Sequence, residues 1–517
     1  MKKWMILTAS AFAALCLNAQ RFINIDFNKT AGPFNTMFKE CVGAGRAHEG
    51  LRADWQQQLA YVRKECGFKY IRMHGLFTDE MAVYTEDSQG RPVYNYMYVD
   101  ALFDYLLSIG MKPFVELGFM PNALASGNKS IFWWRGNVTP PKDYSKWEAL
   151  IKNLAQHFTE RYGAAEVKTW YFEVWNEPNL KDGFWTGTQE DYFKLYDYAV
   201  KGIKAVDKAY KVGGPATAGA AWVPEMMEHC AKNNIPIDFI STHAYGVEQG
   251  FLDEYGNAGT VLSKDRFALS GDVLNSRKQI SASAFPRLEL HYTEWSASYT
   301  PADPIHDSYH EAAYILEKLK QVGNAANSMS YWVFTDIFEE PGPRYTPFHG
   351  GFGLLTIQGI NKPAFYAYRF LNKLGETALV NNDKRSYACK DAKGNVQLLL
   401  WDYTYTLPDS INNQNYYIKD LPSKPKGKVT INLSHVPAGK YSMELFKVGY
   451  RQNDSYTGYV DMGRPGQLSK QQVEQLKNQS SGKPFFTGVI EIKPNSTCSK
   501  TIDINENDVC FINLKPV

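Results

Sequence analysis

The sequence predicts an α/β protein with two parts: a (β/α)8 TIM barrel and an accessory antiparallel β-sandwich domain. From residue 38 to residue 375, short apolar runs alternate with amphipathic stretches, a pattern typical of parallel strands linked by helices. After residue 375 the pattern changes to short strands separated by Pro, Gly and Asn. A chain of 517 residues is long enough for one large barrel and a companion domain.

Eight strands are expected in the barrel, most of them followed by a clear helical pattern. The expected strands are residues 39–44, 70–73, 113–117, 170–174, 212–213, 239–242, 288–292 and 330–334. Helical periodicity is clearest at residues 55–65, 147–161, 190–209 and 310–322. Eight strand–helix units over this length are the pattern of a (β/α)8 barrel.

The second domain is expected to span residues 376–517. Its expected strands are residues 397–402, 428–432, 441–447, 488–492 and 509–514. Residues 20–37 precede the barrel, and their alternating segment 22–27 is expected to add a strand to the sandwich. Cys498 and Cys510 flank a hairpin-like segment and could form a disulfide, although small buried hydrophobic residues are at least as good an interpretation.

Residues 1–19 have the pattern of a signal peptide. Two lysines near the start precede an apolar run at residues 5–15, and the segment ends at Ala19, a small residue that suits signal peptidase. A lipoprotein signal through Cys16 is the weaker alternative, because bulky Leu15 stands where such signals prefer a small residue. We therefore expect an exported protein, periplasmic or extracellular, and no later apolar run is long enough to span a membrane.

The composition argues against nucleic acid and anionic membranes as partners. The formal net charge is +2, the two lysines of the leader account for it, and no basic run follows. Aromatic residues make up 14% of the chain, which mildly favours a carbohydrate partner because sugar rings stack on aromatic faces. No metal-ligand spacing is present, so neither a metal nor a cofactor is expected. The sequence does not define an oligomeric state.

Two glutamates follow strands four and seven of the expected barrel. The fourth strand leads into Trp175-Asn176-Glu177-Pro178, and the seventh into Thr293-Glu294-Trp295. Active sites of such barrels lie at the carboxyl ends of the strands, so these side chains can converge on one ligand. Retaining glycoside hydrolysis needs two carboxyls about 5–5.5 Å apart, one to attack the anomeric carbon and one to protonate the leaving oxygen. A helix cap or a surface ion pair could explain a single glutamate but not both.

Longer stretches resemble glycoside hydrolase family 39, the β-xylosidase and α-L-iduronidase family within the clan of retaining barrel glycosidases. The matching segments are residues 71–77 (IRMHGLF), 172–180 (FEVWNEPNL), 242–246 (THAYG), 293–295 (TEW), 331–340 (YWVFTDIFEE) and 348–355 (FHGGFGLL). A further match at residues 453–463 extends the resemblance over nearly the whole mature chain. The resemblance implies a retaining glycosidase, with an exo-acting β-xylosidase as the first hypothesis.

The resemblance also implies a role for individual residues. Glu177 would be the acid/base, Glu294 the nucleophile, and Asn176 the partner of the sugar 2-hydroxyl. The other substrate-binding residues implied are His74, His243, Tyr245, Trp332, Glu339 and Glu340. Tyr245 would also orient Glu294, Trp332 would form the floor of the subsite, and one of the two last glutamates would bind sugar hydroxyls.

Each implied binding residue has a purely structural alternative. The two histidines could be core residues bonded to backbone, and Trp332 could be part of a barrel layer. The glutamates at residues 339–340 could be a solvated pair beside Arg344. Loops 122–144 and 249–267 match the family least, and such loops set the choice of sugar.

Several functions therefore remain open within this prediction. The alternatives in the same family are a β-galactosidase, an arabinosidase, an α-L-iduronidase or an endo-acting polysaccharide hydrolase. Recognition of a uronate would need a basic side chain, for which Arg344 is the one candidate. A noncatalytic carbohydrate-binding protein on the same barrel is the alternative from another class. The presence of both glutamates with Asn176, His243 and Tyr245 favours an enzyme.

Overall fold

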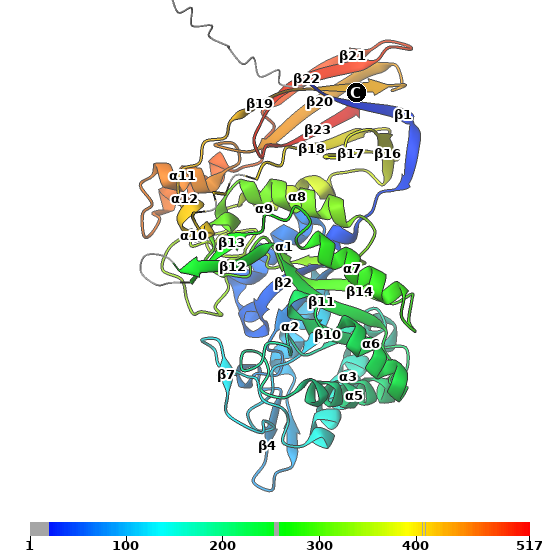
Figure 1. Ribbon diagram of the computed structural model, residues 1–517, viewed down its shortest axis with the longest axis vertical. Coiled ribbons are helices and arrows are strands. Elements are labelled where there is room, and N and C mark those ends of the chain that lie inside the picture. The colour runs from blue at the N-terminus through cyan, green and yellow to red at the C-terminus, as the bar shows by residue number, and fades with distance from the viewer. Residues whose placement is uncertain (1–19, 253–257, 406, 409) are drawn as a thin grey trace, which may run out of the picture.

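The computed structural model describes residues 20–252, 258–405, 407–408 and 410–517. It contains a closed barrel of eight parallel strands and a mostly antiparallel sheet, which lies above the barrel in Figure 1. The predicted fold class is confirmed. The expected signal peptide, residues 1–19, lies outside the described residues. Within the described part of the chain, none of the helices has the length and apolar character needed to cross a membrane.

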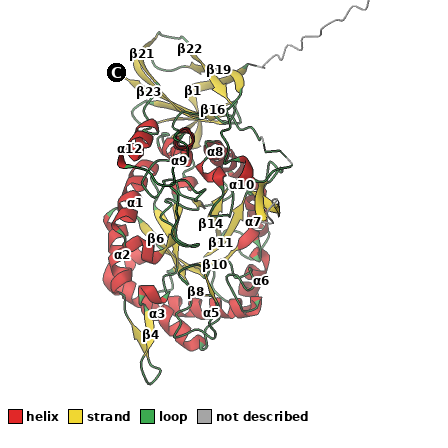
Figure 2. Ribbon diagram, turned by 90° about the vertical axis from the view of Figure 1, so that its left-hand side faces the viewer, coloured by secondary structure: helices red, strands yellow, loops and turns green. Residues whose placement is uncertain are grey.

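The barrel strands follow one another around the ring in sequence order. The last strand, β15, pairs with the first, β2, and this pairing closes the ring. They lie inside the ring of helices seen in Figure 2. The strands are β2 (Cys41–Arg46), β3 (Tyr70–His74), β6 (Lys112–Leu117), β9 (Tyr171–Val174), β10 (Lys211–Thr217), β11 (Phe239–Tyr245), β14 (Glu289–Ser296) and β15 (Ser328–Tyr331).

A helix follows every barrel strand. These helices are α1 (Ala53–Cys66), α2 (Met97–Ser108), α3 (Tyr144–Tyr162) with the short α4 (Ala164–Val167), α5 (Gln189–Val206), α6 (Val223–Asn233), α7 (Ser270–Ser281), α8 (His310–Val322) and α9 (Pro363–Asn372). In α5 the Thr188 hydroxyl accepts from the Asp191 N–H at 3.1 Å, which completes a capping box. Tyr192, Leu195 and Ala199 are buried at the helical spacing, so this face packs against the barrel.

The last barrel strand differs from its prediction. Residues 330–334 were expected to be a strand, but β15 ends at Tyr331. The next residues stay buried, yet their backbone bonds elsewhere: the Phe334 N–H donates to Gly43 O at 3.1 Å, and the Val333 N–H to Phe352 O at 3.4 Å. The apolar run therefore marks burial correctly, but the regular ladder ends at Tyr331, and the next residues bond to the loop residue Phe352 and to Gly43 in β2.

Three short hairpins occupy loops of the barrel. They are β4 (Tyr84–Glu86) with β5 (Pro92–Tyr94), β7 (Ser130–Ile131) with β8 (Gly136–Asn137), and β12 (Val247–Leu252) with β13 (Ala258–Leu262). The second and third of these hairpins fall in the two loops that matched the family least. Both loops leave the barrel at the carboxyl ends of strands, β6 and β11.

The second domain is a nine-stranded sheet ordered β21-β20-β23-β18-β17-β16-β1-β19-β22. Its strands are β1 (Arg21–Pro33), β16 (Thr377–Asn381), β17 (Ser386–Lys390), β18 (Val396–Trp401), β19 (Pro425–Ser434), β20 (Gly439–Val448), β21 (Phe486–Ile492), β22 (Cys498–Asn505) and β23 (Val509–Pro516). The N-terminal strand β1 lies between β16 and β19 and is parallel to β19. This parallel pair departs from the predicted antiparallel pattern, and it is possible because the whole barrel separates the two strands in sequence.

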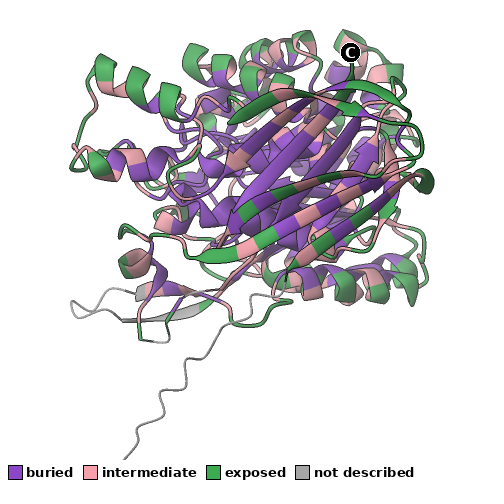
Figure 3. Cartoon of the chain, turned by 90° about the horizontal axis from the view of Figure 1, so that it is seen from above, coloured by how far each residue is buried: buried purple, intermediate pink, exposed green. Residues whose placement is uncertain are grey.

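The sheet folds over one apolar core. Ile23 and Val429 come from one half of the sheet and Leu398 and Ile512 from the other, yet all four belong to the same buried cluster. Buried residues alternate with more exposed ones in β19 and over most of β20 (Figure 3), as a strand with one buried face requires, whereas β18 is buried at every residue. Two halves of a sheet that share a core in this way form a sandwich.

The possible disulfide between Cys498 and Cys510 does not form, and both cysteines are free. Cys498 pairs with Leu433 in β19, whereas Cys510 pairs with Leu400 in β18. The two strands therefore belong to different halves of the sheet, and the segment between the cysteines does not form the hairpin that their spacing suggested.

The sheet domain also carries three helices that reach the barrel: α10 (Asn413–Tyr416), α11 (Ser455–Asp461) and α12 (Lys470–Gln479). The Asn413 side chain accepts from the Leu262 N–H at 3.0 Å and donates to Asp303 at 2.8 Å. Tyr459 packs on Phe348 with ring centroids 4.9 Å apart. The second domain thus supports loops that follow barrel strands six, seven and eight.

A buried lysine organises one of these loops. The Lys362 ammonium lies 2.6 Å from Asp307 and 2.6 Å from Asp336, and all three side chains are buried. The two carboxylates also accept from the backbone N–H groups of Gly350 and Gly353, both at 2.7 Å. This cluster therefore fixes the loop at residues 348–355.

Replacing this lysine should destabilise the fold. Lys362→Met leaves two aspartates buried without a cation, which typically costs about 3–5 kcal/mol of the free energy of unfolding. Urea unfolding at pH 7, followed by tryptophan fluorescence, measures the change. Lys470→Met, at an exposed position, is the matched control and should alter the free energy by less than about 0.5 kcal/mol. A Lys362→Met variant as stable as the control would show that the cluster does not hold the loop.

Candidate active site

A cavity of about 430 Å³ opens at the carboxyl ends of the barrel strands. It is lined by His74, Asn176, Glu177, Leu180, Phe184, Ala218, Gly219, Tyr245, Val247, Glu294, Tyr299, Trp332, Glu340 and Phe352. Most of the predicted site residues are thus gathered in one place. His243 lies behind Glu177, and Glu339 points away from the cavity, as described below.

The two predicted catalytic glutamates face each other across this cavity. Glu294 is within β14, and Glu177 follows β9 in a turn whose backbone is left-handed at Trp175 (φ 71°) and Glu177 (φ 44°). The Glu177 N–H donates to Ala216 O at 2.8 Å, which holds the turn. An oxygen of each glutamate and a ring nitrogen of His243 all lie within 4.8 Å of one another. This separation suits retention, since inverting enzymes keep their carboxyls about 6.5–9.5 Å apart.

A buried arginine, Arg72 in β3, connects the site. Its guanidinium contacts Glu294 at 2.6 Å, Glu173 at 2.7 Å and Glu116 at 2.9 Å, and donates to the Asn176 side-chain oxygen at 2.8 Å. Burial by itself would lower the pKa of Arg72, but the three carboxylates raise it above its ordinary value. The arginine is therefore a permanent positive charge beneath the cavity.

Glu294 is held as a hydrogen-bond acceptor. One carboxylate oxygen accepts from Arg72 at 2.6 Å, and the other accepts from the Tyr245 hydroxyl at 2.7 Å. Burial raises the pKa of Tyr245 well above its ordinary value, and the neighbouring Glu294 adds to this, so the phenol keeps its proton. Donors that favour the charged form of a carboxylate stabilise it as an anion, which is the state a nucleophile needs.

Glu177 is in a different environment. Burial raises its pKa to about 7, although Arg72 acts in the opposite direction, and Glu116 raises it further. Its carboxyl lies 2.8 Å from His243 Nδ1, and burial lowers the pKa of that histidine below its ordinary value. A buried carboxyl with a pKa of about 7 can hold a proton near neutral pH, as a general acid must.

Two further residues are placed to meet a sugar. The Asn176 side-chain nitrogen is buried and has no partner within the described protein, so it is free to donate to a hydroxyl in the cavity. His74 is bonded to Glu116 at 2.6 Å and packs 4.8 Å from Trp332, measured between ring centroids. Burial lowers the pKa of His74 to about 3, so the ring is neutral and can donate or accept.

The two adjacent glutamates after β15 have separate positions. Glu340 lines the cavity, and burial raises its pKa well above the ordinary value, with Glu294 adding to the effect. Glu339 instead forms ion pairs with Arg46 and Arg52, both at 3.0 Å. Of the two glutamates predicted as candidates for binding sugar hydroxyls, Glu340 can reach a sugar in the cavity, whereas Glu339 anchors the turn.

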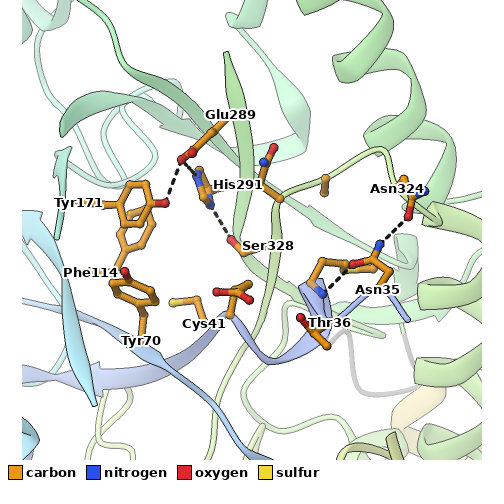
Figure 4. Close-up of a pocket in the computed structure, with 14 residues that line it drawn as sticks. Asn35, Thr36, Cys41, Tyr70, Phe114, Tyr171, Glu289, His291, Asn324 and Ser328 are labelled. Carbon is orange, nitrogen blue, oxygen red and sulfur yellow. Dashed lines mark hydrogen bonds and ion pairs between the residues drawn. The ribbon is translucent and has the colours of Figure 1, made fainter. Parts of the chain in front are cut away.

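A second hollow of about 420 Å³ lies at the opposite end of the barrel, where the strands begin (Figure 4). Several of its polar side chains are bonded to one another. His291 lies 2.7 Å from the Ser328 hydroxyl and 3.2 Å from Glu289, which also accepts from the Tyr171 hydroxyl at 2.8 Å. In (β/α)8 enzymes this end contributes to stability and the other end to catalysis, so we assign the chemistry to the first cavity.

The described residues contain one cluster of three His, Cys, Asp or Glu side chains close enough to share a metal ion, and it consists of Glu177, His243 and Glu294. Arg72 already supplies a positive charge 2.6 Å from Glu294. Retaining hydrolysis by two carboxyls needs no metal, so the cluster fits catalysis by its own side chains.

Comparison with known proteins identifies the family. The model of glycosyl hydrolases family 39 matches residues 21–487. The chain belongs to this family. It is therefore a glycoside hydrolase, and the family acts with retention of configuration, in agreement with the close approach of Glu177 and Glu294.

This family 39 hydrolase has relatives that are similar over nearly their full length. A β-xylosidase of Caldicellulosiruptor saccharolyticus is 41% identical over 461 residues, which cover 88% of this chain and 90% of the relative. A β-xylosidase of Geobacillus stearothermophilus is 35% identical over 493 residues, 94% of each chain. The crystal structure of a monomeric β-xylosidase from Caulobacter crescentus matches with a TM-score of 0.93 at 42% identity, covering 96% of this chain and 100% of that one.

Sequence reasoning did not assign a role to the charged residues beneath the site of this hydrolase. Arg72, Glu116 and Glu173 are each fully or almost fully buried. All three lie inside barrel strands, among apolar neighbours. A charged residue in the middle of an otherwise apolar strand was the available signal, because such residues are almost never buried without a partner.

Proposed function

We propose that this family 39 hydrolase is an exo-acting β-xylosidase in which Glu177 is the acid/base and Glu294 the nucleophile. The observation that carries the proposal is the paired glutamates within 4.8 Å at the closed end of one cavity. The β-xylosidases that are 35% and 41% identical over most of this chain support the choice of sugar.

The proposed reaction has two displacements. Glu294 attacks the anomeric carbon and forms a covalent glycosyl-enzyme, while Glu177 gives its proton to the departing glycosidic oxygen. Glu177, now a carboxylate, then takes a proton from water, whose oxygen attacks the anomeric carbon and releases Glu294. The Asn176 side-chain nitrogen, which lacks a partner in the described protein, would bond the 2-hydroxyl as the transition state forms.

Exo-action is supported by the loops that close one side of the cavity. The loop that contains β7 and β8 meets the turn after β15, where the Trp133 N–H donates to Glu340 O at 2.8 Å. Trp133 also lies against Gly342, at which a Cβ would come within 3.2 Å of the indole ring. A polysaccharide could not continue past this junction, so the cavity would accept a chain end.

A neutral sugar suits the lining better than a uronate. Neither Arg nor Lys is among the residues that line the cavity in the described structure, and Arg344 is bonded instead to Pro301 O at 3.0 Å. Glu340 occupies the wall of the cavity and offers no positive charge to pair with a uronate. Trp332 and Phe352 crowd the same end, which leaves little room for a hydroxymethyl group on the ring.

We also propose that the protein is exported after cleavage behind Ala19. The support is the pattern of the leader: two lysines, an apolar run and a small residue at the cleavage position. A substrate that is a polysaccharide or a large oligosaccharide would be met outside the cytoplasm.

The two glutamates should respond differently to the leaving group. Glu177→Ala should lose about 10²–10⁴-fold of kcat/KM on phenyl xyloside and much less on dinitrophenyl xyloside, because an acidic phenol departs without a proton. Glu294→Ala is the matched variant and should lose activity on both, since the covalent step is missing. Steady-state kinetics on the two substrates measures the contrast. If Glu177→Ala lost kcat/KM equally on the two substrates, as Glu294→Ala should, the two roles would be assigned wrongly.

The choice of sugar is tested with one enzyme preparation and three nitrophenyl glycosides. We expect kcat/KM on the β-D-xyloside to exceed that on the β-D-glucoside and β-D-galactoside by roughly tenfold to a few hundredfold, because packing against an extra hydroxymethyl costs about 1–3 kcal/mol. Faster turnover of the galactoside, or of an arabinoside, would reject the β-xylosidase proposal and leave the retaining mechanism intact.

Export is tested by expressing the full chain in a bacterial host. The mature protein should be recovered outside the cytoplasm with Gln20 as its first residue, as determined by mass spectrometry. Leu7→Arg is the control variant: it interrupts the apolar run, so the chain should remain full-length in the cytoplasm. Recovery of uncleaved wild-type chain in the cytoplasm would contradict the proposal.

A further inference from the structure

Four buried side chains form a chain of hydrogen bonds that ends at the proposed acid. His243 Nδ1 lies 2.8 Å from Glu177, and His243 Nε2 lies 3.1 Å from the Thr293 hydroxyl. The Thr293 hydroxyl donates to Glu173 at 2.8 Å. Thr293 immediately precedes Glu294, but its side chain is on the far side of His243 from Glu177 and does not line the cavity.

The direction of each bond follows from what each group can donate. Burial would raise the pKa of Glu173, but Arg72, which donates to it at 2.7 Å, lowers it below the ordinary value, so Glu173 is a carboxylate and only accepts. The single hydroxyl proton of Thr293 is therefore committed to Glu173. The Thr293 oxygen must then accept from His243 Nε2, which carries the ring proton.

The tautomer of His243 decides the state of Glu177. Burial lowers the pKa of His243, so the ring is neutral and has one proton, on Nε2. Nδ1 then presents a lone pair to Glu177 at 2.8 Å and can only accept. A protonated Glu177 donates to it, whereas a carboxylate would face a second acceptor.

From this geometry we infer that Thr293 and Glu173 are positioning residues, which fix the tautomer of His243 and thereby keep Glu177 protonated in the free enzyme. The inference rests on the proposed role of Glu177 as acid/base and adds two residues to it. A hydrogen bond to the neutral form of a carboxyl favours that form. Once the proton has passed to the leaving oxygen, the same lone pair makes the Glu177 carboxylate a stronger base toward water.

Other ionisable groups also act on Glu177 and His243, but their charges stay the same when Thr293 is replaced. The ionisable groups that face Glu177 and His243 from the surrounding strands and loops are Arg72, His74, Glu116, Glu173, Tyr245, Glu294 and Glu340. Replacing Thr293 with a neutral residue changes none of these charges. A shift in the pKa of Glu177 in such a variant would therefore report a change in its hydrogen bond with His243 and not a change in the surrounding charges.

Thr293→Val is the decisive variant, because valine has the shape of threonine without its hydroxyl. His243 is then free to carry its proton on Nδ1 and donate to the Glu177 carboxylate. The alkaline limb of kcat/KM against pH, measured on phenyl xyloside, should move to lower pH by about one unit or more. Thr293→Ser keeps the hydroxyl and should keep the limb at its wild-type position. A Thr293→Val enzyme that is slower with an unmoved limb would overturn the inference.

A direct measurement of the tautomer protects the test against misfolding of Thr293→Val. In wild-type protein with ¹⁵N-labelled histidine, the signals lost in His243→Gln identify this ring. Its Nε2 should show an attached proton and its Nδ1 should not, and Thr293→Val should reduce that preference. A proton on Nδ1 in the wild type would refute the inference while the proposed function stands. If the Nε2 tautomer is found but Glu177→Ala loses kcat/KM equally on phenyl and dinitrophenyl xyloside, the proposed acid/base role is wrong instead.

Discussion

The active site depends on one buried positive charge. Arg72 lies beneath the cavity with no exposed surface and binds three carboxylates, of which Glu294 is one and Glu116 and Glu173 are the others. A guanidinium without its partners would be too costly to bury, and so would the carboxylates without the guanidinium. The planar fork of arginine matches several acceptors at once, which a lysine could not do. Each partner is thereby fixed in position, and the site is preorganised before any sugar binds.

The two proposed catalytic carboxyls differ in their surroundings. Glu294 receives hydrogen bonds from Arg72 and Tyr245, and both favour its anion. For Glu177, burial raises the pKa to about 7, and the neighbouring side chain is His243, whose Nδ1 lies 2.8 Å away. Two identical side chains within 4.8 Å of each other therefore lie in different surroundings.

The sheet domain serves this site indirectly. Through Asn413 it bonds the loops that follow strands six and seven, and through Tyr459 it packs on Phe348 in the loop after strand eight. Phe352 in that loop lines the cavity, and the Lys362 cluster holds the loop from within the barrel. The second domain thus helps to set the shape of the pocket.

The sequence by itself determined the barrel, the sheet domain and the two facing glutamates, because strand and helix periods and strand-end motifs are local properties of the chain. It also placed the β1 segment in the second domain, although it did not show that β1 lies parallel to β19. Only the tertiary structure showed which ionisable groups meet Arg72, that Glu340 and not Glu339 faces the cavity, and which way the bonds through Thr293 run. Thr293 and its acceptor Glu173 are 120 positions apart, so no local pattern shows that they meet. Proton positions and pKa values depend on such distant contacts at hydrogen-bond range, and no local pattern encodes them.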